Sequence, residues 1–329
     1  MAGIQYGHEK FRSMKILICG LGSIGKRQAR LLKNHFSHEL FALRTGIGQE
    51  KNELLIPELD SWKEVGSFDA AFITNPTHRH LETAIECAGR GMHLFIEKPL
   101  DCKTKGLAEL VKLVEERQKV AYVAYPLRFH PLIRKLKSEL QDKKILHARM
   151  VCSSYLPDWR PSQDHKNSYS SYRSKGGGVI LDLSHELDNA VFLFGDLEKI
   201  EGHSGRRSDL TVDAEDFADL ILLHSGENSG MVTSVHLDYF GRPSQRIVEV
   251  QTADGFFKVD LISNTYASFQ HVSGHLEETQ DSIMLDRDEL YLTQLRYFFE
   301  NLQNSKRMEN NLSEASRLFY KLIEFRGES

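Results

Sequence analysis

Asp182 and His185 are the residues of this 329-residue chain whose types and spacing best suit acid–base chemistry. The glycine cluster at 176–178 precedes them, and we expect it to lead flexibly into one apolar helix that runs to about Phe194. On a helix that turns ~100° per residue, the two side chains lie roughly 60° apart, on one side. A carboxylate beside an imidazole there is a plausible proton-transfer pair.

A second group of residues, Gly20, Gly22 and Gly25, has the G-x-G-x-x-G spacing. The motif follows an apolar run at 15–19, which predicts a buried parallel strand, and it opens a predicted helix over 26–34. Gly20 permits a tight turn, Gly22 lets the backbone approach a pyrophosphate, and Gly25 lets helix and strand pack closely. Because the helix N-terminus then faces the phosphates, this run predicts a dinucleotide site rather than a purely structural turn.

The residues that end the second predicted strand bear on the choice of dinucleotide. NAD(H) would call for a carboxylate there, to accept a hydrogen bond from the ribose 2′-hydroxyl. The chain has Arg44 and Thr45 at this place, and a guanidinium and a hydroxyl suit a 2′-phosphate. We therefore expect NADP(H) in preference to NAD(H), the alternative being that Arg44 is a solvated surface charge.

Composition sets the broad class. The chain is 40% hydrophobic and 27% charged, which is typical of an ordinary globular protein, and its length favours two domains. The net charge of −4 predicts neither a nucleic-acid partner nor an anionic membrane. There is no apolar stretch long enough to span a bilayer, and residues 1–13 lack a signal-peptide core, so we expect a loose tail and a cytoplasmic protein.

The cysteines and histidines suggest no metal. Four scattered cysteines without a C-x-x-C pair predict reduced thiols. His78 and His80 form an H-x-H pair that lacks a carboxylate or thiol partner nearby in sequence.

The order of the predicted elements indicates how these residues are positioned. Strands and helices alternate through residues 1–125, which predicts an α/β Rossmann domain, a doubly wound parallel sheet. The pattern changes in residues 126–329, where we expect an α+β domain with a large, mostly antiparallel open sheet. The predicted strands of the first domain are 15–19, 40–43, 69–74, 93–96 and 120–125; those of the second are 145–154 and a meander of 217–224, 230–239, 246–252 and 256–261. Helices are predicted over 26–34, 81–88, 103–118, 132–140, 288–304 and 312–325.

Together with the glycine motif, four further segments resemble the glucose–fructose oxidoreductase / inositol dehydrogenase / MocA (Gfo/Idh/MocA) family over nearly the whole chain. In order they are residues 74–80 (TNPTHRH), 97–99 (EKP), 125–131 (YPLRFHP) and 176–188 (GGGVILDLSHELD). The resemblance implies a Rossmann domain followed by an α+β domain whose sheet often forms subunit contacts. It therefore implies a homodimer or homotetramer assembled through the C-terminal sheet.

The resemblance also implies roles for particular residues. Lys98 would contact both the nicotinamide ribose and the substrate oxygen, His185 would be the acid/base, and Asp182 would hold and polarise His185. The cofactor residues would be Gly20, Gly22, Ser23, Ile24, Gly25, Arg44, Thr45, Thr74, Asn75, Pro76, His80, Glu97 and Lys98. The substrate residues would be Arg128, Trp159 and Arg160, with His236 added from its place on a polar strand face.

Physical chemistry supports these roles independently. A carbinol carbon loses hydride only as its hydroxyl proton is removed, so a base must lie within ~3 Å of that oxygen. A lysine beside it stabilises the developing alkoxide charge. Pro99 permits a cis peptide after Lys98, although trans is the default expectation.

The chain departs from the family pattern at one point, because the histidine should lie four residues after the aspartate. Here His185 is at three and Glu186 at four. Either an irregular turn restores the placement or Glu186 takes part, and we favour His185. We expect Asp188 to be structural, bonded to a backbone group or a neighbouring arginine.

Two further groups of polar residues can each be interpreted in two ways. The face made by Ser234, His236 and Asp238 could line the substrate cleft, or it could meet solvent or a neighbouring subunit. Arg242 and Arg246 could bind an anionic substrate group, but we favour a solvated pair.

The sequence thus predicts an NAD(P)-dependent oxidoreductase. It would transfer a hydride between nicotinamide and a hydroxyl or keto carbon of a sugar, sugar derivative or cyclitol, with surface-polysaccharide sugars as one substrate class suggested by the resemblance. The alternatives are an imine- or dihydrodiol-type reductase and a non-catalytic nucleotide- and ligand-binding regulator. Intact Lys98 and His185 argue against the regulator, since a pure sensor needs neither.

Overall fold

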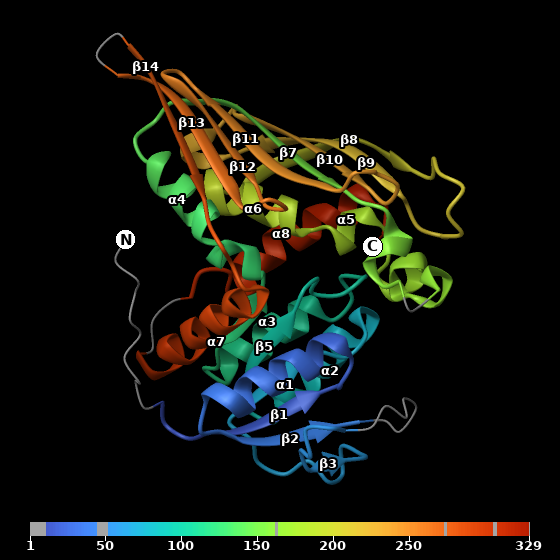
Figure 1. The fold of residues 1–329 in the computed structure, drawn as a ribbon. Helices are drawn as coiled ribbons and strands as arrows, with labels where there is room; N and C mark the ends of the chain where they lie inside the picture. Colours follow the sequence, from blue (N-terminus) through green and yellow to red (C-terminus); the bar gives the residue numbers. More distant parts are fainter. Residues whose placement is uncertain (1–10, 45–51, 162–163, 273–274, 305–307, 329) are drawn as a thin grey trace.

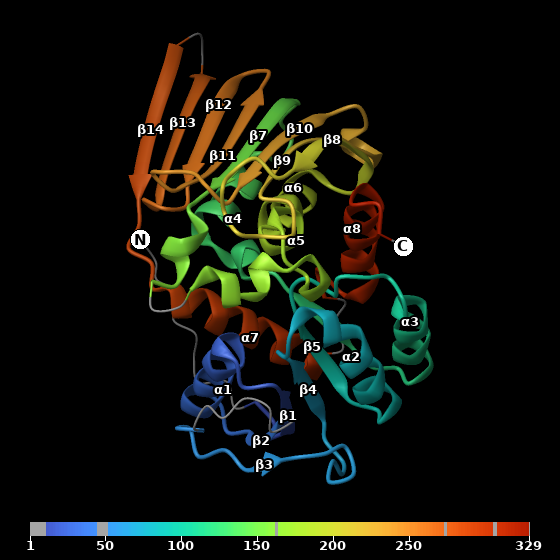
Figure 2. The same ribbon diagram turned by 90° about the vertical axis from the view of Figure 1, so that its right-hand side faces the viewer.

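The computed structural model describes residues 11–44, 52–161, 164–272, 275–304 and 308–328. Two sheets lie one above the other, with helices between and around them (Figures 1 and 2). A six-stranded sheet forms the lower half in these views, and an eight-stranded sheet forms the upper half. This arrangement confirms the predicted fold class.

The six-stranded sheet is wholly parallel, with strand order β3-β2-β1-β4-β5-β6. The order reverses between β1 and β4, and ligands of open α/β sheets bind outside the carboxyl ends of the strands at such a point. The strands are β1 Lys15–Cys19, β2 Glu39–Leu43, β3 Glu58–Leu59, β4 Ala70–Ile73, β5 His93–Glu97 and β6 Ala121–Ala124.

Helices cover both faces of this sheet, because successive side chains of its buried strands point to opposite sides. α2 (His80–Gly89) and α3 (Leu107–Glu116) pack on the face that contains Ile73 and Ile96. α1 (Ser23–His35) lies on the other face, together with α7 (Arg287–Asn304) from the far end of the chain. The stretch 126–329 therefore contributes part of the helical layer that covers one face of the first sheet.

Aromatic rings join α7 to that sheet. Phe298 lies edge-on to Phe72 and Phe95, with ring centroids 5.9 and 5.4 Å apart, and all three side chains are fully buried.

The eight-stranded sheet is mixed. Its order is β14-β13-β12-β11-β7-β10-β9-β8, and every pairing is antiparallel except that of β7 with β10. The predicted simple meander is therefore wrong where β7 enters between β10 and β11. The strands are β7 Ile145–Ser153, β8 Leu197–Gly205, β9 Phe217–His224, β10 Val232–Asp238, β11 Gln245–Thr252, β12 Gly255–Asp260, β13 Thr265–Val272 and β14 His275–Ser282.

One face of the second sheet packs on helices. Figure 2 shows α4 (Pro131–Glu139), α5 (Val179–Asp182) and α6 (His185–Phe194) beneath the strands, with α8 (Leu312–Phe325) beside them. In β10 the side chains of Val235 and Leu237 are buried toward α5 and α6. Ser234 and His236 consequently point to the outer face.

Short 3₁₀ turns form much of the connection from β7 to α5. These are η3 Leu156–Trp159, η4 His165–Asn167, η5 Tyr169–Ser171 and η6 Arg173–Lys175; the others are η1 Thr77–Arg79, η2 Pro126–Phe129 and η7 Gly226–Asn228. The single helix expected after the glycine cluster, running to about Phe194, is also wrong, because Leu183 and Ser184 separate α5 from α6. Among the helices described, none is both long and apolar enough to cross a membrane.

We predict that Phe298→Ala lowers the free energy of unfolding by about 3–5 kcal/mol, because it opens a cavity between α7 and the first sheet. Denaturant unfolding followed by tryptophan fluorescence and circular dichroism measures the loss. Tyr320→Ala, at a side chain 44% exposed on α8, is the control and should change stability by well under half as much. Equal losses in the two variants would contradict the packing role of α7.

Candidate active site

The glycine-rich loop after β1 has the geometry of a phosphate site. A Cβ on Gly22 would meet no heavy atom within 4 Å, so the backbone there is open to a ligand. A Cβ on Gly25 would instead collide with the carbonyl oxygen of Gly20, which explains why glycine is needed under the loop. α1 begins at Ser23 and Ile24 without a side-chain cap, so its first N–H groups are free of such a partner. These residues fit a dinucleotide pyrophosphate.

The loop after β4 lies against the glycine-rich loop. Thr74 donates from its hydroxyl to the Gly20 carbonyl oxygen at 2.7 Å. Asn75 donates to Thr83, and its Oδ1 is buried with no hydrogen-bond partner among the described residues. This unpartnered, buried oxygen beside Pro76 can accept a hydrogen bond from a ligand bound at this edge of the first sheet.

His80 connects the loops that contain Asn75 and Pro99. Its Nδ1 lies 2.8 Å from the Pro99 carbonyl oxygen, and its Nε2 lies 2.8 Å from that of Asn75. Burial lowers the pKa of His80, so the ring is neutral and donates to one of the two oxygens. The Lys98–Pro99 peptide held in this way is cis, so the expectation of trans is wrong.

Glu97, at the end of β5, is buried beneath α1. Gln28 donates to its Oε1 at 2.7 Å. Burial raises the pKa of Glu97 to about 7, although the Gln28 hydrogen bond and the neighbouring Lys98 charge lower it.

Lys98 reaches from the first sheet to α5. Its Nζ donates to the backbone oxygen of Asp182 at 2.7 Å and lies 3.8 Å from Asp182 Oδ1. The lysine side chain is 15% exposed and the aspartate side chain 3%. The structure thus brings together two of the three residues predicted to be catalytic.

His185 lies close by but not in the predicted pairing. No hydrogen bond joins it to Asp182 within the described chain; its Nδ1 is buried without a partner, and its ring packs edge-on to Tyr125 at 5.5 Å. The break at 183–184 explains this, since Asp182 ends α5 and His185 begins α6. Burial lowers the pKa of His185 well below its usual value, and the charges of Lys98, Arg246 and Arg287 lower it further. A neutral imidazole is thereby held among cations.

Glu186 is occupied elsewhere. Arg246 donates to both of its carboxylate oxygens, at 2.6 and 3.0 Å. The turn at 183–184 is irregular, as one of the two explanations for the three-residue spacing required, but within the described chain it leaves His185 without a hydrogen bond to Asp182. The favoured solvated pair is wrong for Arg246, which lies in this ion pair. Arg242 is exposed, with its guanidinium over the Tyr155 ring.

Arg128 lies in a buried ion pair. It donates from Nε and Nη2 to Asp188 at 2.8 and 2.7 Å, and both side chains are buried. Asp188 therefore has the structural role expected of it, with a neighbouring arginine as its partner.

The remaining predicted substrate residues divide into two groups. Trp159 donates to Ser154 at 2.9 Å, while the exposed Arg160 lies over the Tyr169 ring at 5.8 Å. Both belong to the segment 156–175 that borders the site. His236 lies on the outer sheet face instead, between Asp219 and Asp238 at 2.6 and 2.9 Å. That face is turned away from α5 and α6.

Sequence reasoning missed two tyrosines, Tyr169 and Tyr239, whose hydroxyls donate to Asp182 at 2.7 and 3.1 Å. Tyr169 lies in a polar stretch with no periodicity, and Tyr239 follows a strand by one residue. No signal along the chain pairs either with Asp182, because only the fold brings them together.

At the end of β2, Arg44 forms an ion pair with Glu58 at 2.8 Å. Thr45 lies outside the described residues.

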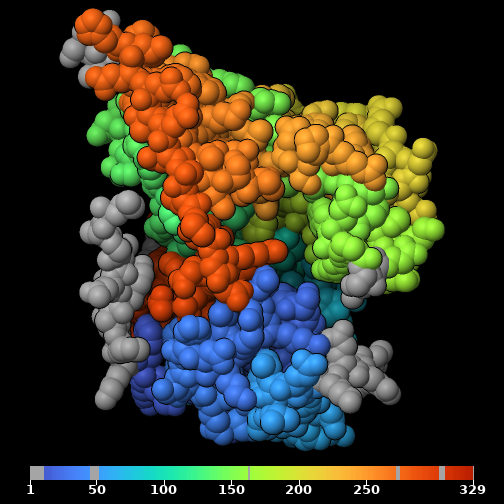
Figure 3. All heavy atoms as spheres, in the orientation of Figure 1, coloured from blue at the N-terminus to red at the C-terminus, as the bar shows by residue number. Residues whose placement is uncertain are grey.

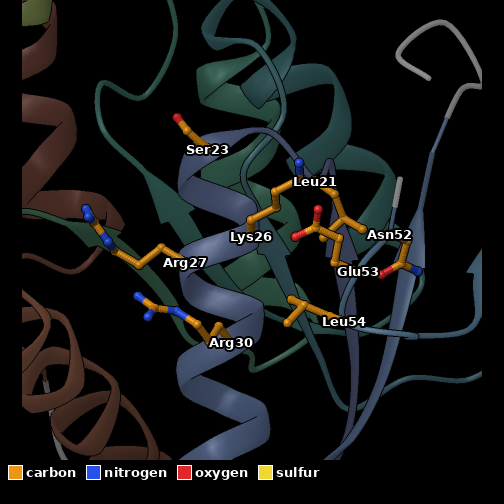
Figure 4. A pocket seen from close by; sticks show the side chains of 8 residues that line it. All are labelled: Leu21, Ser23, Lys26, Arg27, Arg30, Asn52, Glu53 and Leu54. Atoms are coloured by element: carbon orange, nitrogen blue, oxygen red, sulfur yellow. The ribbon is translucent and has the colours of Figure 1, made fainter. Parts of the chain in front are cut away.

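A hollow of about 270 Å³ beside α1 borders Leu21 and Ser23 of the glycine-rich loop (Figure 4). Arg27 and Arg30 point to one side of it, where both pair with Asp288. Neither Lys98 nor His185 lines this hollow.

Within the ranges described, no group of three or more histidine, cysteine, aspartate or glutamate side chains is arranged to hold a metal ion. Figure 3 shows the visible face hollowed between the blue first domain and the yellow-green segment above it.

Comparison with known proteins identifies the class to which this fold and site belong. Residues 14–125 match the model of an oxidoreductase family with an NAD-binding Rossmann fold, and residues 133–258 match the Gfo/Idh/MocA C-terminal domain. The chain therefore belongs to the Gfo/Idh/MocA family of oxidoreductases, as the sequence motifs predicted.

Similar proteins cover different shares of the chain. Myo-inositol 2-dehydrogenase of Thermotoga maritima is 26% identical over 89% of each chain. The 2,7-anhydro-N-acetylneuraminate hydratase of Mediterraneibacter gnavus is 25% identical over 54% of this chain and 48% of its own length, so the chain matches about half of that relative. A solved oxidoreductase of Agrobacterium radiobacter, in complex with NAD+, L-tartaric acid and magnesium, superposes with a TM-score of 0.80 at 16% identity, over 96% of this chain and 97% of its own.

We predict that Glu97→Gln stabilises the protein at alkaline pH. A pKa raised from 4.5 to about 7 means that the folded state binds more protons than the unfolded state between these values, so wild-type stability falls as pH rises through them. Because a glutamine side chain does not titrate, the stability advantage of the variant over wild type should grow by about 2 kcal/mol from about pH 5.5 to about pH 8. Denaturant unfolding at the two pH values measures it, and a constant difference would refute the titration of Glu97.

Proposed function

We propose that this protein is an NAD(P)-dependent dehydrogenase or reductase acting on a hydroxyl or keto carbon of a sugar, sugar derivative or cyclitol. One observation carries the proposal. Lys98, at the carboxyl end of β5, is held against Asp182 beside a half-buried neutral His185, next to a glycine-rich loop that fits a dinucleotide. Relatives named as inositol and anhydro-neuraminate enzymes support the substrate class.

The arrangement supplies both groups that alcohol oxidation needs. A bound nicotinamide would supply the hydride acceptor or donor. The neutral imidazole of His185 can take the hydroxyl proton, and among the described residues no hydrogen-bond donor occupies its Nδ1. The Lys98 ammonium has three N–H donors, of which one is bonded to Asp182, so the others can stabilise an alkoxide.

We propose further that the cofactor is NADP(H). Arg44 ends β2 where a ribose-binding carboxylate would otherwise stand, and Glu58 orients its guanidinium. We also infer a homodimer or homotetramer formed through the outer face of the second sheet. Its polar, partly exposed side chains, such as His147 with Ser234 and Arg149 with Glu249, suit a hydrated subunit contact.

We predict that Lys98→Met and His185→Asn each lower kcat/KM by about 10²-fold or more, because one removes alkoxide stabilisation and the other the proton acceptor. Nicotinamide absorbance over a panel of sugars, cyclitols and ketones measures turnover. Lys103→Met, at an exposed lysine near Lys98, is the matched control and should behave as wild type. Unchanged turnover in both site variants would refute the assignment; cofactor binding without any turnover would favour the regulator.

We predict that Arg44→Ala weakens NADP(H) binding by about 10–100-fold and leaves NAD(H) binding within a factor of about three, because only the first has a 2′-phosphate for the guanidinium. Fluorescence titration of the purified protein with each cofactor gives both constants. Arg117→Ala, at an exposed arginine of the same domain, serves as control. Tighter binding of NAD(H) than NADP(H) by the wild type would overturn the cofactor preference.

A further inference from the structure

Both carboxylate oxygens of Asp182 are occupied by tyrosine hydroxyls from separate parts of the second domain. Tyr169 donates to Oδ1 at 2.7 Å, and Tyr239 donates to Oδ2 at 3.1 Å. Burial raises the pKa of each tyrosine well above its usual value, so both hydroxyls remain protonated donors at any working pH. The carboxylate is thus fixed from two sides within a buried site.

The glycine run at 176–178 makes the first of these contacts possible. A Cβ on Gly177 would lie 2.5 Å from the backbone oxygens of Tyr169 and Ser170, so only glycine lets the Tyr169 turn pack there. Backbone bonds complete the junction, with Gly177 N donating to Tyr172 O and Gly178 N to Ser170 O. The run is therefore a fixed docking point for Tyr169, in contrast to the flexible lead expected from the sequence.

Neighbouring side chains support both tyrosines. Trp159 lies edge-on to the Tyr239 ring at 5.4 Å, and Arg160 lies over the Tyr169 ring at 5.8 Å. The segment predicted to face substrate therefore also buttresses the two hydroxyl donors.

We propose that Tyr169 and Tyr239 are positioning residues that turn the Asp182 carboxylate toward Lys98 and away from His185. With both oxygens fixed, Oδ1 lies 3.8 Å from Lys98 Nζ, while Asp182 O accepts the lysine's hydrogen bond at 2.7 Å. The aspartate and lysine form one unit, and His185 acts without a carboxylate partner among the described residues. The inference rests on the proposed function, in which Lys98 contacts the substrate oxygen.

The first test is kinetic. Tyr169→Phe should lower kcat about tenfold, the equivalent of one charge-assisted hydrogen bond, and leave KM for substrate and cofactor within about twofold. The deuterium isotope effect on kcat should rise, because a displaced Lys98 slows the chemical step. Tyr172→Phe, which alters the same segment but no contact with Asp182, is the matched control. A raised substrate KM at unchanged kcat would overturn the proposal in favour of direct substrate binding.

A double-mutant cycle shows whether Tyr169 acts through Asp182. In an Asp182→Asn background, Tyr169→Phe should reduce kcat by less than about twofold, because the charged acceptor is already lost. Fully additive losses would overturn the proposal. Tyr239→Phe takes the place of Tyr169→Phe in the same cycle if the first variant does not fold.

A second readout does not require activity. Lys98 acylation by an amine-reactive reagent, followed by peptide mass spectrometry on the cofactor-free protein, should be several-fold faster in Tyr169→Phe than in wild type. Lys103 in the same spectra is the internal control. An unchanged Lys98 rate would overturn the positioning role. If no substrate reacts but Lys98 labelling accelerates, the dehydrogenase assignment fails and the tyrosine contacts stand.

Discussion

The contact between Lys98 and Asp182 is the constraint on which the rest of the site depends. The residues are 84 positions apart, one at the end of the first sheet and the other at the end of α5. Because Lys98 bonds the backbone oxygen of Asp182, the contact fixes where a main-chain segment lies as well as a side chain. The His80 bridge to Pro99 and the glycine run at 176–178 hold the two ends of this contact in register.

The stretch from Asp182 to Asp188 shows how burial distributes charge around the site. Glu186 and Asp188 each receive two hydrogen bonds from one arginine, and both ion pairs fix α6 against neighbouring elements. Removing one partner of such a buried pair leaves an uncompensated charge, which costs several kcal/mol. Asp182 is bound by hydroxyls and lysine instead. His185 forms no hydrogen bond with a carboxylate among the described residues, and burial together with the neighbouring cations lowers its pKa.

The sequence predicted much of what depends on neighbouring residues along the chain, although it missed the break at 183–184 and the cis Lys98–Pro99 peptide. The strand–glycine–helix unit and the position of Lys98 after β5 both follow from local pattern, so both agree with the structure. The sequence did not predict which residues contact each other across the fold. Arg128 could not be matched with Asp188, nor Tyr169 with Asp182, because no periodicity encodes contacts between distant segments. His236 was placed correctly on a strand, but the choice of face required the helices beneath it. β14 escaped detection because all eight of its side chains are exposed, which leaves no apolar alternation.

The return of α7 to the first sheet has a consequence for the order of biosynthesis. A ribosome completes β6 at Ala124, more than 160 residues before it reaches Arg287 at the start of α7. Until then Phe72 and Phe95 lack the cover that Phe298 gives them. The nascent Rossmann half therefore carries an apolar face, which a chaperone can hold, throughout translation of the second sheet. A fragment that stops before α7 should therefore aggregate through this apolar face rather than fold as an independent nucleotide-binding domain.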